Sequence, residues 1–326
     1  MDRLNGELLA RGLHRRSLLS LVVAGGVLSR MSVRAAAAQD KPTVKIGSKD
    51  FTEQVLINEM LAQLLEDAGY PVERQLNLGG SAIVHQALVN GDIDTYIEYT
   101  GTGLLAILNL TLEDAATPTA GAAATPMAGV DPVYETVKRE YKDQFNLVWL
   151  DPLGFNNTYT LALTQEKAQE LGVTKISDLV GKANDLTFGG TQEFLTRPDG
   201  LPGLTAAYEG LEFGDAKGFD PGLVYQAVDS GDVDVISAFA TDGRIPALGL
   251  VTLEDDLGFF PPYFAAPVVR QDLLDQDAAV ADVINMLAGK IDDQTMADLN
   301  SQIDVEGMEP EDVARAFLQE QGLIGQ

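Results

Sequence analysis

The sequence predicts an α/β protein built from two related lobes, and three observations support this prediction. The chain has 326 residues, a length that favours about two domains. From residue 43 onward, strand-like segments alternate with helix-like segments, an order typical of mostly parallel sheets with helices on both faces. The stretch HQALVNGDID at 85–94 returns as YQAVDSGDVD at 225–234. We therefore expect two lobes of related topology, with equivalent strand ends facing one ligand cleft.

Residues 1–39 differ from the rest and are predicted to be an export signal. They contain six arginines, an apolar run at 18–28 and four alanines at 35–38. The run rises about 16 Å as a helix, too short for a bilayer core of about 30 Å, and the alanines are typical of a signal-peptidase site. Arg15-Arg16 is similar to a twin-arginine signal; an uncleaved amphipathic extension is the alternative. Because no cysteine follows the run, a lipid anchor is excluded, and we expect a soluble protein in the periplasm or another extracytoplasmic space.

The first lobe is predicted from three strands and two helices that alternate along the chain. The strands are expected at 43–47, 72–78 and 93–97. Apolar residues recur at helical spacing from 55 to 65, so a helix should follow the first strand and end at Gly69. Asp50 is expected to cap this helix, with Glu53 as the second member of a capping box. The second helix is predicted at 82–89.

The rest of the chain supplies the second lobe and a return to the first. Residues 111–130 are rich in Ala, Thr, Pro and Gly, which indicates a flexible surface insert. We expect a helix at 131–141, an extended segment at 147–150, a crossing at 151–152, a return at 258–262, and helices from 278 to 321 that pack on the first lobe. Lobe 1 should therefore comprise 43–151 and 264–326, and lobe 2 should comprise 152–263.

Composition excludes several classes of function. The chain carries 49 acidic and 22 basic residues, a formal net charge of -27, which argues against nucleic-acid binding because phosphates need a basic surface. Cysteine is absent, so disulfides, thiol catalysis, cysteine-ligated zinc and iron–sulfur clusters are excluded. The only histidines are His14 and His85. We expect no metal site and no cofactor.

Several aromatic and cationic residues, and one residue with a hydroxyl group, stand at predicted strand ends and loops, where binding residues concentrate. These residues are Lys49, Tyr99, Thr102, Tyr159, Arg197, Phe239 and Tyr263. Aromatic faces attract cations with about 0.5–2 kcal/mol per contact, and a quaternary ammonium needs such faces because it has no N–H to donate. Arginine and lysine supply donors for a carboxylate. The pattern indicates a ligand that combines a compact cation with a carboxylate.

Each of these residues also has a structural interpretation. Any one tyrosine can be a half-buried packing residue. Lys49 can be a solvated charge at a helix start. Arg197 can brace its own turn through Glu193 or Asp199.

Seven short motifs together resemble one known family. They are IGSKDFTEQ at 46–54, LNLGG at 76–80, EYTGTG at 98–103, GFNNTY at 154–159, TRPDG at 196–200, TDGR at 241–244 and PPY at 261–263. In this order they resemble the substrate-binding proteins of osmoprotectant ABC importers of the glycine betaine/choline/carnitine type, over about residues 43–324. The resemblance implies a type II periplasmic-binding-protein fold with a hinged ligand cleft.

The resemblance also implies roles for the site residues. Tyr99, Tyr159, Phe239 and Tyr263 would form an aromatic cage for a trimethylammonium group. Lys49, Thr102 and Arg197 would bind the carboxylate, together with a backbone N–H near Asn157. Members of the family usually carry tyrosine at the position of Phe239, so this chain keeps the ring face and lacks the hydroxyl, and the preferred ligand can differ.

The function implied is capture of a quaternary-ammonium osmoprotectant, such as glycine betaine, and delivery to a membrane permease by a monomer without catalytic activity. One alternative is a binding protein for another zwitterion, such as an amino acid. Another is an extracellular hydrolase that uses Asp92, Asp94 and Glu98 as paired acids. The first two acids recur as Asp232 and Asp234, which favours a structural role in a turn, and no G-x-S-x-G or H-E-x-x-H motif is present.

Overall fold

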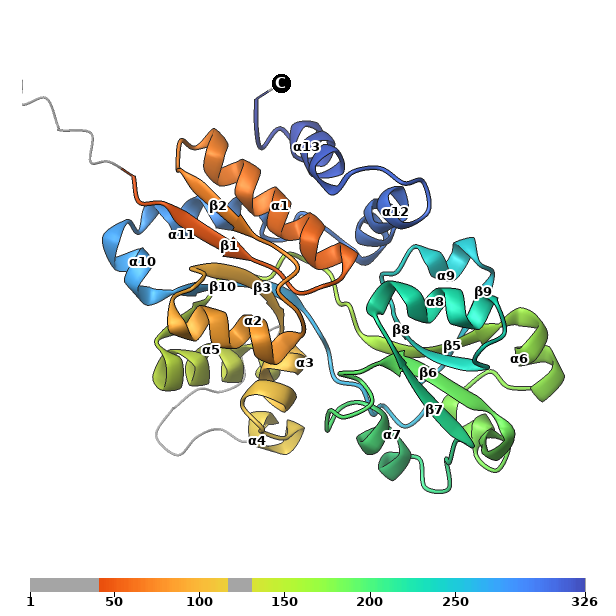
Figure 1. Cartoon of the computed structure of the whole chain (residues 1–326). Coiled ribbons are helices and arrows are strands. Elements are labelled where there is room, and N and C mark those ends of the chain that lie inside the picture. The colour runs from red at the N-terminus through yellow and green to blue at the C-terminus, as the bar shows by residue number, and fades with distance from the viewer. Residues whose placement is uncertain (1–40, 117–130, 326) are drawn as a thin grey trace, which may run out of the picture. The chain divides into compact units, whose positions relative to one another are not determined.

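The computed structural model of the chain describes residues 41–116 and 131–325. The export signal predicted at 1–39 and residues 117–130 of the predicted insert lie outside the described residues. Within the described part, two five-stranded sheets each carry their own helices (Figure 1). We call the sheet that contains β1 and its helices lobe 1, and the sheet that contains β6 and its helices lobe 2.

The sheet of lobe 1 has the strand order β2-β1-β3-β10-β4. Its strands are β1 (Val44–Gly47), β2 (Val72–Gln75), β3 (Thr95–Tyr99), β4 (Leu147–Trp149) and β10 (Ala265–Arg270). Strand β10 runs antiparallel to both β3 and β4, whereas β1 is parallel to β2 and β3. One reversed strand in an otherwise parallel sheet confirms the predicted mostly parallel class.

The sheet of lobe 2 repeats this plan with the order β7-β6-β8-β5-β9. Its strands are β5 (Tyr159–Thr164), β6 (Thr187–Thr191), β7 (Asp215–Phe219), β8 (Val235–Phe239) and β9 (Leu250–Leu253). Here β5 is the reversed strand, antiparallel to β8 and β9. When the two strand orders are aligned, β3 and β8 occupy equivalent positions in their sheets, as the internal sequence repeat predicts.

The repeated sequence builds the same turn twice. In lobe 1 the backbone N–H of Asp94 donates to the carbonyl of Lys45, and the Asp94 carboxylate accepts the backbone N–H of Lys45 at 2.9 Å. In lobe 2 Asp234 and Thr187 exchange the same two bonds, with the carboxylate contact again at 2.9 Å. Asp94 and Asp234 therefore pin a turn to a neighbouring strand, as expected for a structural role.

These turns also move the strands relative to the prediction. Residues 91–94 are used for the turn, so β3 begins at Thr95 and ends at Tyr99, two residues later than the predicted 93–97. Strand β8 likewise ends at Phe239. The equivalent strands β3 and β8 thus each end in an aromatic residue, Tyr99 and Phe239. Sheet pairing fixes the backbone at both strand ends.

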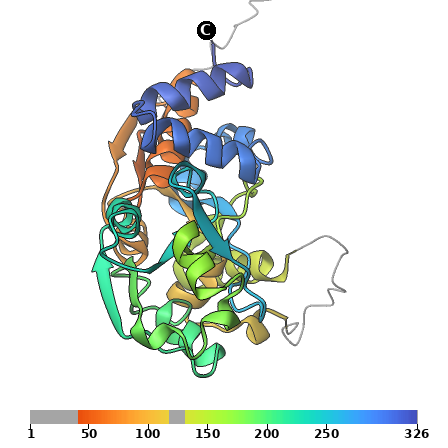
Figure 2. The same ribbon diagram turned by 90° about the vertical axis from the view of Figure 1, so that its right-hand side faces the viewer.

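The helices of lobe 1 come from the first part of the chain and from its C-terminal part. They are α1 (Thr52–Asp67), α2 (Ser81–Asn90), α3 (Thr100–Thr102), the π-helical turn η1 (Gly103–Ile107), α4 (Leu112–Ala116), α5 (Pro132–Phe145), α10 (Gln271–Gln276), α11 (Ala279–Ile284), the 3-10 turn η4 (Asn285–Leu287), α12 (Asp293–Asp304) and α13 (Pro310–Glu320). Helix α1 packs against α11, α12 and α13, and Figure 2 shows the two C-terminal helices in dark blue beside it.

The helices of lobe 2 are shorter. They are α6 (Gln165–Leu171), the 3-10 turns η2 (Ile176–Leu179) and η3 (Ala183–Asp185), α7 (Leu201–Ala207), α8 (Pro221–Asp229) and α9 (Arg244–Ala247). No helix of the described residues combines the length and the apolar character that crossing a bilayer requires.

Two local predictions are wrong. Helix α1 is not capped by Asp50, because Phe51 is its N-cap and no side chain bonds there; Glu53 instead turns into the interior. The predicted insert is not wholly irregular, because residues 112–116 form α4. Its start has a capping pair in which Thr111 N–H donates to Asp114 at 2.8 Å and Asp114 N–H donates to the Thr111 hydroxyl at 3.2 Å.

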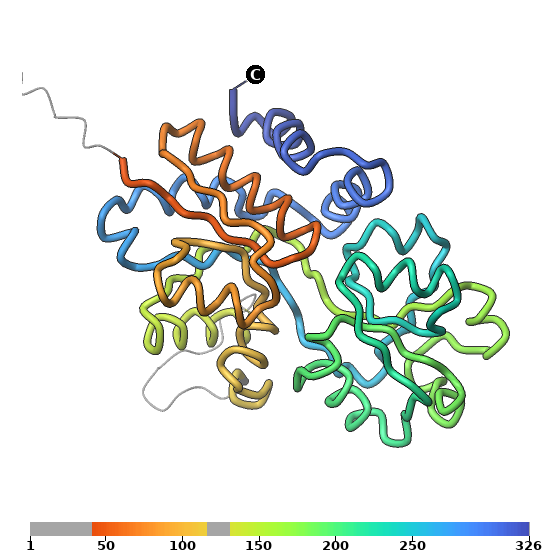
Figure 3. Tube along the Cα trace, in the orientation of Figure 1, coloured from red at the N-terminus to blue at the C-terminus, as the bar shows by residue number. Residues whose placement is uncertain are grey.

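The chain crosses between the two sheets twice. It leaves lobe 1 after β4 and returns between β9 and β10, and Figure 3 shows these segments as adjacent yellow-green and light blue traces. An antiparallel bridge between Asn156 and Phe264 joins them. Because the crossings are paired with each other, they hold the residues that flank them at a fixed position between the lobes.

Candidate functional site

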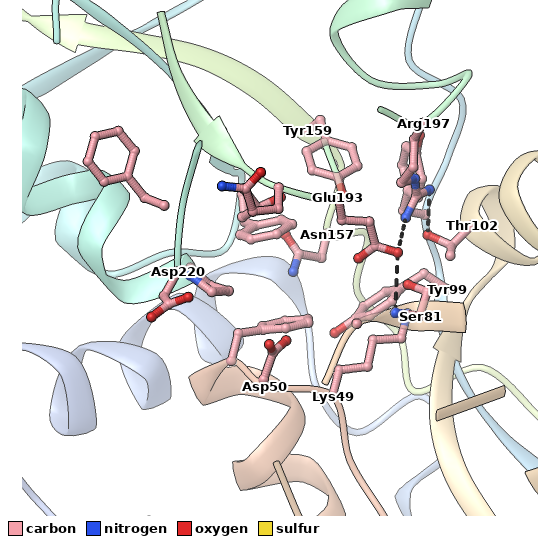
Figure 4. Close-up of a pocket in the computed structure, with 18 residues that line it drawn as sticks. Lys49, Asp50, Ser81, Tyr99, Thr102, Asn157, Tyr159, Glu193, Arg197 and Asp220 are labelled. Carbon is pink, nitrogen blue, oxygen red and sulfur yellow. Dashed lines mark hydrogen bonds and ion pairs between the residues drawn. The ribbon is translucent and has the colours of Figure 1, made fainter. Parts of the chain in front are cut away.

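A pocket of about 250 Å³ lies where residues of both lobes meet. All eight residues predicted for the site line it: Lys49, Tyr99, Thr102, Asn157, Tyr159, Arg197, Phe239 and Tyr263 (Figure 4). The reason is the arrangement of the strands: Tyr99 ends β3, Phe239 ends β8, and Tyr159 begins β5. Tyr159 and Phe239 are also direct partners across the β5–β8 ladder.

The aromatic side chains of the pocket touch one another. The ring of Tyr159 lies 5.2 Å from that of Phe239 and makes an edge contact with Tyr263 at 5.4 Å between centroids. Tyr99, Tyr159 and Tyr263 are buried, with exposed fractions of 4%, 8% and 1%. Burial raises the pKa of all three tyrosines. These rings therefore present neutral aromatic walls to the pocket.

Sequence reasoning missed another ring of this wall, Phe51. Its ring stacks on Phe239 with centroids 5.2 Å apart and planes inclined by 10°, and it lies 6.2 Å from the ring of Tyr99. At this spacing the two phenylalanine rings are in direct contact, so a trimethylammonium group cannot lie between them. Phe219, the last residue of β7, also lines the pocket. Both residues follow or end a strand, which is the signal that could have identified them.

Lys49 is a buried ion-pair partner. It is 3% exposed, and its Nζ lies 2.5 Å from Oε1 of the fully buried Glu98. Its Nζ is also 5.1 Å from the ring centre of Tyr99. The interpretation of Lys49 as a solvated charge is therefore wrong. Because an ammonium group has three donors, pairing with Glu98 leaves donors for a ligand.

Arg197 braces its own loop and also reaches the other lobe. Its Nε donates to Asp199 Oδ1 at 2.8 Å, its Nη2 donates to Asp199 Oδ2, and Nη2 also donates to Thr102 Oγ1 at 3.1 Å. Its Nη1 lies 3.5 Å from Oε1 of Glu193. Burial alone would lower the pKa of Arg197, but the neighbouring Tyr159 and acids outweigh it and hold the pKa well above its usual range. A guanidinium has five N–H groups, and the bonds to Asp199 and Thr102 use those of Nε and Nη2, so the Nη1 side retains donor capacity beside Glu193.

Two further contacts belong to the loop that carries Arg197. Glu193 accepts the backbone N–H of Ser81 at 3.2 Å across the lobes, as the dashed lines of Figure 4 show. The hydroxyl of Tyr263 donates to Asp199 Oδ2 at 2.7 Å. Glu193 and Asp199 were predicted only as partners of Arg197, and their contacts with Ser81 and Tyr263 are additional.

Asn157, near which a backbone N–H was expected to bind the carboxylate, uses its own N–H groups within the chain. Its backbone N–H donates to the carbonyl of Tyr263 at 3.1 Å. Its side-chain Nδ2 donates to Glu53 at 2.8 Å. Both bonds hold the crossing segment in place. The backbone N–H of Asn157 is therefore already used and does not point to a ligand carboxylate as a free donor.

Glu53, absent from the predicted site, is the centre of the buried network behind the pocket. Its carboxylate accepts bonds from Tyr99 Oη at 2.6 Å, Thr241 Oγ1 at 2.5 Å, and the side-chain amides of Asn157 and Asn300 at 2.8 and 3.1 Å. These donors come from β3, from the stretch after β8, from a crossing segment and from α12. Burial raises the pKa of Glu53, although the four bonds oppose this effect.

The described residues 41–116 and 131–325 contain no group of three or more His, Cys, Asp or Glu side chains placed to hold a metal ion. Two α/β lobes joined by two crossings, with a small mixed aromatic and charged pocket between them, define a solute-binding protein of the two-lobed, hinged class.

Comparisons with known proteins identify the family within this class. Residues 42–320 match the family described as the substrate binding domain of ABC-type glycine betaine transport systems. The chain belongs to this family. A crystal structure described as a glycine betaine/carnitine/choline ABC transporter superposes with a TM-score of 0.66 and 33% identity, covering 86% of this chain and 99% of the other. The predicted type II periplasmic-binding-protein fold is thereby confirmed.

Two curated relatives extend the comparison. A glycine-betaine-binding protein of Pseudomonas aeruginosa is 36% identical over 301 residues, covering 89% of this chain and 91% of the relative. A protein of Helicobacter pylori named ergothioneine transport permease/ergothioneine binding protein is 37% identical over 288 residues, which is 88% of this chain. The chain spans about half of that relative, 49% of its length.

Gly101 is the close-approach point that lets the Tyr263 ring reach the pocket wall. A Cβ at this position would lie 2.7 Å from Cε1 of Tyr263 and 3.0 Å from the carbonyl of Pro262. Overpacking of this kind costs about 1–3 kcal/mol. We expect Gly101→Ala to displace the ring and weaken ligand binding about tenfold, which corresponds to about 1.4 kcal/mol. Calorimetry on Gly222→Ala, where the nearest atom would be 3.5 Å away, is the matched control; equal affinity in both variants would contradict the role of Gly101.

The raised pKa of Glu53 predicts a pH-dependent term in stability. The folded chain keeps this proton at pH values where the unfolded chain, with an ordinary pKa of 4.5, has lost it. The contribution is therefore fully present below pH 4.5 and declines as the pH rises through the folded-state value. We expect the free energy of unfolding of the wild type, relative to Glu53→Gln, to fall as the pH is raised from 4.5 towards neutrality. Urea unfolding of both proteins measures this, with the exposed Glu73→Gln as control; a difference that does not change with pH would refute it.

Proposed function

We propose that this protein is an extracytoplasmic solute-binding protein that captures a quaternary-ammonium osmoprotectant, glycine betaine or a close relative, and delivers it to the permease of an ABC importer. The observation that carries the proposal is the meeting of three buried tyrosines with Lys49 and Arg197 around one small pocket. Aromatic faces bind a methylated cation, and the two cations retain donors for a carboxylate.

The size of the pocket supports a small ligand. Its volume of about 250 Å³ lies below the range of about 300–1,000 Å³ typical of drug-sized ligands. Burial of the tyrosine hydroxyls keeps the rings neutral, which suits a ligand that brings its own positive charge. In this proposal the trimethylammonium group lies against Tyr99, Tyr159 and Tyr263, with Phe239 at the edge of the cage and braced by Phe51.

The charges of the site support a zwitterion. Lys49 is paired with Glu98, and Arg197 is paired with Asp199, so each cation is already neutralised by an acid of the chain. We infer that a carboxylate is recognised through directed hydrogen bonds from Lys49 Nζ, Arg197 Nη1 and Thr102 Oγ1, and that the acids Asp50, Glu193 and Asp220, which also line the pocket, favour a ligand that carries a cation as well. Asn157 contributes by holding the crossing segment.

The same proposal covers the organisation of the chain. Residues 43–151 and 264–326 form one moving lobe, residues 152–263 form the other, and residues 1–39 direct export. The protein acts as a monomer and performs no catalysis, and Asp92, Asp94 and Glu98 have structural roles. An amino acid is a weaker candidate ligand because a primary ammonium group would leave its N–H donors facing aromatic rings.

A calorimetric panel tests the ligand class. We expect micromolar binding of at least one of glycine betaine, proline betaine, carnitine, choline and ergothioneine, the last included because of the name of the Helicobacter pylori relative. Micromolar affinity corresponds to about 8 kcal/mol, within reach of three rings and a carboxylate clamp. Glycine and proline are the controls, because they lack methylated nitrogen. No binding across the panel, or tighter binding of the controls, would reject the proposal.

Arg197 tests how the carboxylate is recognised. We expect Arg197→Ala to weaken the binding of glycine betaine at least tenfold more than that of choline, because choline carries a hydroxyl where glycine betaine carries a carboxylate. The ratio of the two dissociation constants is the readout, since any general disturbance from leaving Asp199 unpaired affects both ligands. Equal losses would mean that Arg197 only shapes its loop.

A further inference from the structure

The TDGR motif at 241–244 lies outside the lining of the ligand pocket, although it directly follows β8. The motif belongs to lobe 2, but its contacts reach α1 and α12, which are helices of lobe 1. The Thr241 hydroxyl donates to Glu53, and the Thr241 carbonyl accepts a bond from Asn300 Nδ2 at 2.9 Å. The motif is therefore a point at which lobe 2 is attached to lobe 1 behind the pocket.

Gly243 allows α12 to approach the motif closely. A Cβ at this position would lie 2.6 Å from Cα and 2.7 Å from the backbone nitrogen of Ser301 in α12. The backbone of Gly243 is right-handed, with φ of -64° and ψ of -18°, a conformation that side chains of ordinary residues tolerate. The space left by the missing side chain is thus occupied by the other lobe, and the turn itself does not need glycine.

Arg244 adds an ion pair between the lobes. Its Nη2 bonds Asp242 Oδ2 at 2.6 Å and lies 3.4 Å from Oδ2 of Asp304 in α12. The side chains of Arg244 and Asp304 are only 16% and 11% exposed, so solvent screens their attraction weakly. The guanidinium carbon also lies 4.2 Å from the ring centre of Tyr225, whose hydroxyl accepts the backbone N–H of Phe239 at 3.1 Å. Arg244 therefore connects lobe 1 to the segment that carries Phe239.

The lobe 1 end of this ion pair is connected to Phe51. Asp304 Oδ1 accepts the hydroxyl of Thr52 at 2.6 Å, and Thr52 directly follows Phe51 in the chain. A cavity of about 10 Å³ has Phe51, Phe239, Arg244 and Asp304 among its lining residues. The ion pair thus lies directly behind the two stacked rings, whose centroids are 5.2 Å apart.

We propose that the TDGR motif and α12 form an interlobe clasp, which holds the Phe51 and Phe239 rings stacked and sets ligand affinity from outside the pocket. The clasp comprises residues 241–244, Asn300, Ser301 and Asp304. This inference rests on the proposed function and adds residues that control affinity. Arg244 and Asp304 are positioning residues, because they act through the two rings. Apparent affinity falls with the fraction of molecules in the binding conformation, so loosening the clasp weakens every ligand by the same factor.

Gly243→Ala is the first test. The added methyl group fits the backbone of the turn and meets Ser301 only while the lobes are together, so the variant should fold and close poorly. Calorimetry should show dissociation constants at least fivefold higher, by the same factor for every panel ligand that binds the wild type. Stopped-flow kinetics should assign most of this loss to faster dissociation. Gly222→Ala, where the nearest atom is Arg244 Nη1 at 3.5 Å, is the control and should stay within twofold of wild type.

Asp304→Asn tests the ion pair without adding volume. The variant keeps an acceptor for Thr52 and loses the charge that faces Arg244, so we expect the same uniform loss, at least threefold. Adding Arg244→Gln should weaken binding no further than Arg244→Gln alone, because residues of one pair are not additive. Asp298→Asn is the matched control, since Asp298 lies on the same helix, is exposed and bonds Gln294.

Scattering separates this inference from the proposed function. Without ligand, small-angle X-ray scattering should give a larger radius of gyration for Gly243→Ala and Asp304→Asn than for their controls, because a loosened clasp lets the lobes move apart. If no ligand of the panel binds, the proposed function fails and this comparison alone decides, with equal radii overturning the clasp. If a ligand binds, the affinities decide: values equal to those of the controls, or a loss confined to ligands with a carboxylate, would overturn the clasp and leave the proposed function standing.

Discussion

The arrangement of the site depends on one buried carboxylate. Within the described residues 41–116 and 131–325, Glu53 forms no ion pair, and a lone buried charge is costly. Four hydrogen-bond donors offset that cost, and they come from both lobes, from a crossing segment and from α12. Because one of the donors, Thr241, belongs to lobe 2, satisfying this group favours the arrangement in which the two lobes meet. The same bonds orient Tyr99 and Asn157, so the pocket wall and the meeting of the lobes are set by one network.

A second constraint is the repeat of one topological unit. Both sheets place a single reversed strand beside the third parallel strand. The third strand of each lobe ends in an aromatic residue, Tyr99 in one and Phe239 in the other. Carboxyl ends of parallel strands gather at one edge of a sheet, so two copies of the unit that face each other deliver rings from distant sequence positions to one pocket.

Sequence patterns predicted the α/β class, the repeat and seven of the residues that line the pocket, because alternation, spacing and strand ends are local properties; Asn157 was implied only by the family resemblance. Local reasoning also named the acids that brace Arg197, which lie within four residues of it, but it did not predict partners far away in the sequence. Lys49 finds Glu98, and Glu53 finds Thr241, across 49 and 188 positions, distances that no local rule spans. The failed capping box has the same cause: a local rule assigned Glu53 to its own helix end, whereas tertiary donors drew it into the interior.

The ion pairs of Lys49 and Arg197 also limit how closure of the cleft can contribute to ligand affinity. Arg197 already bonds Thr102 across the lobes, and Lys49 and Arg197 each already have an acid partner before a ligand enters. In the proposed function, a ligand carboxylate would add hydrogen bonds to donors supplied by both lobes. Because those bonds would exist together only when the lobes meet, the proposed ligand would bind the closed form more tightly and shift the population towards it. The proposed function therefore couples recognition of the ligand to closure of the cleft through donors supplied by both lobes.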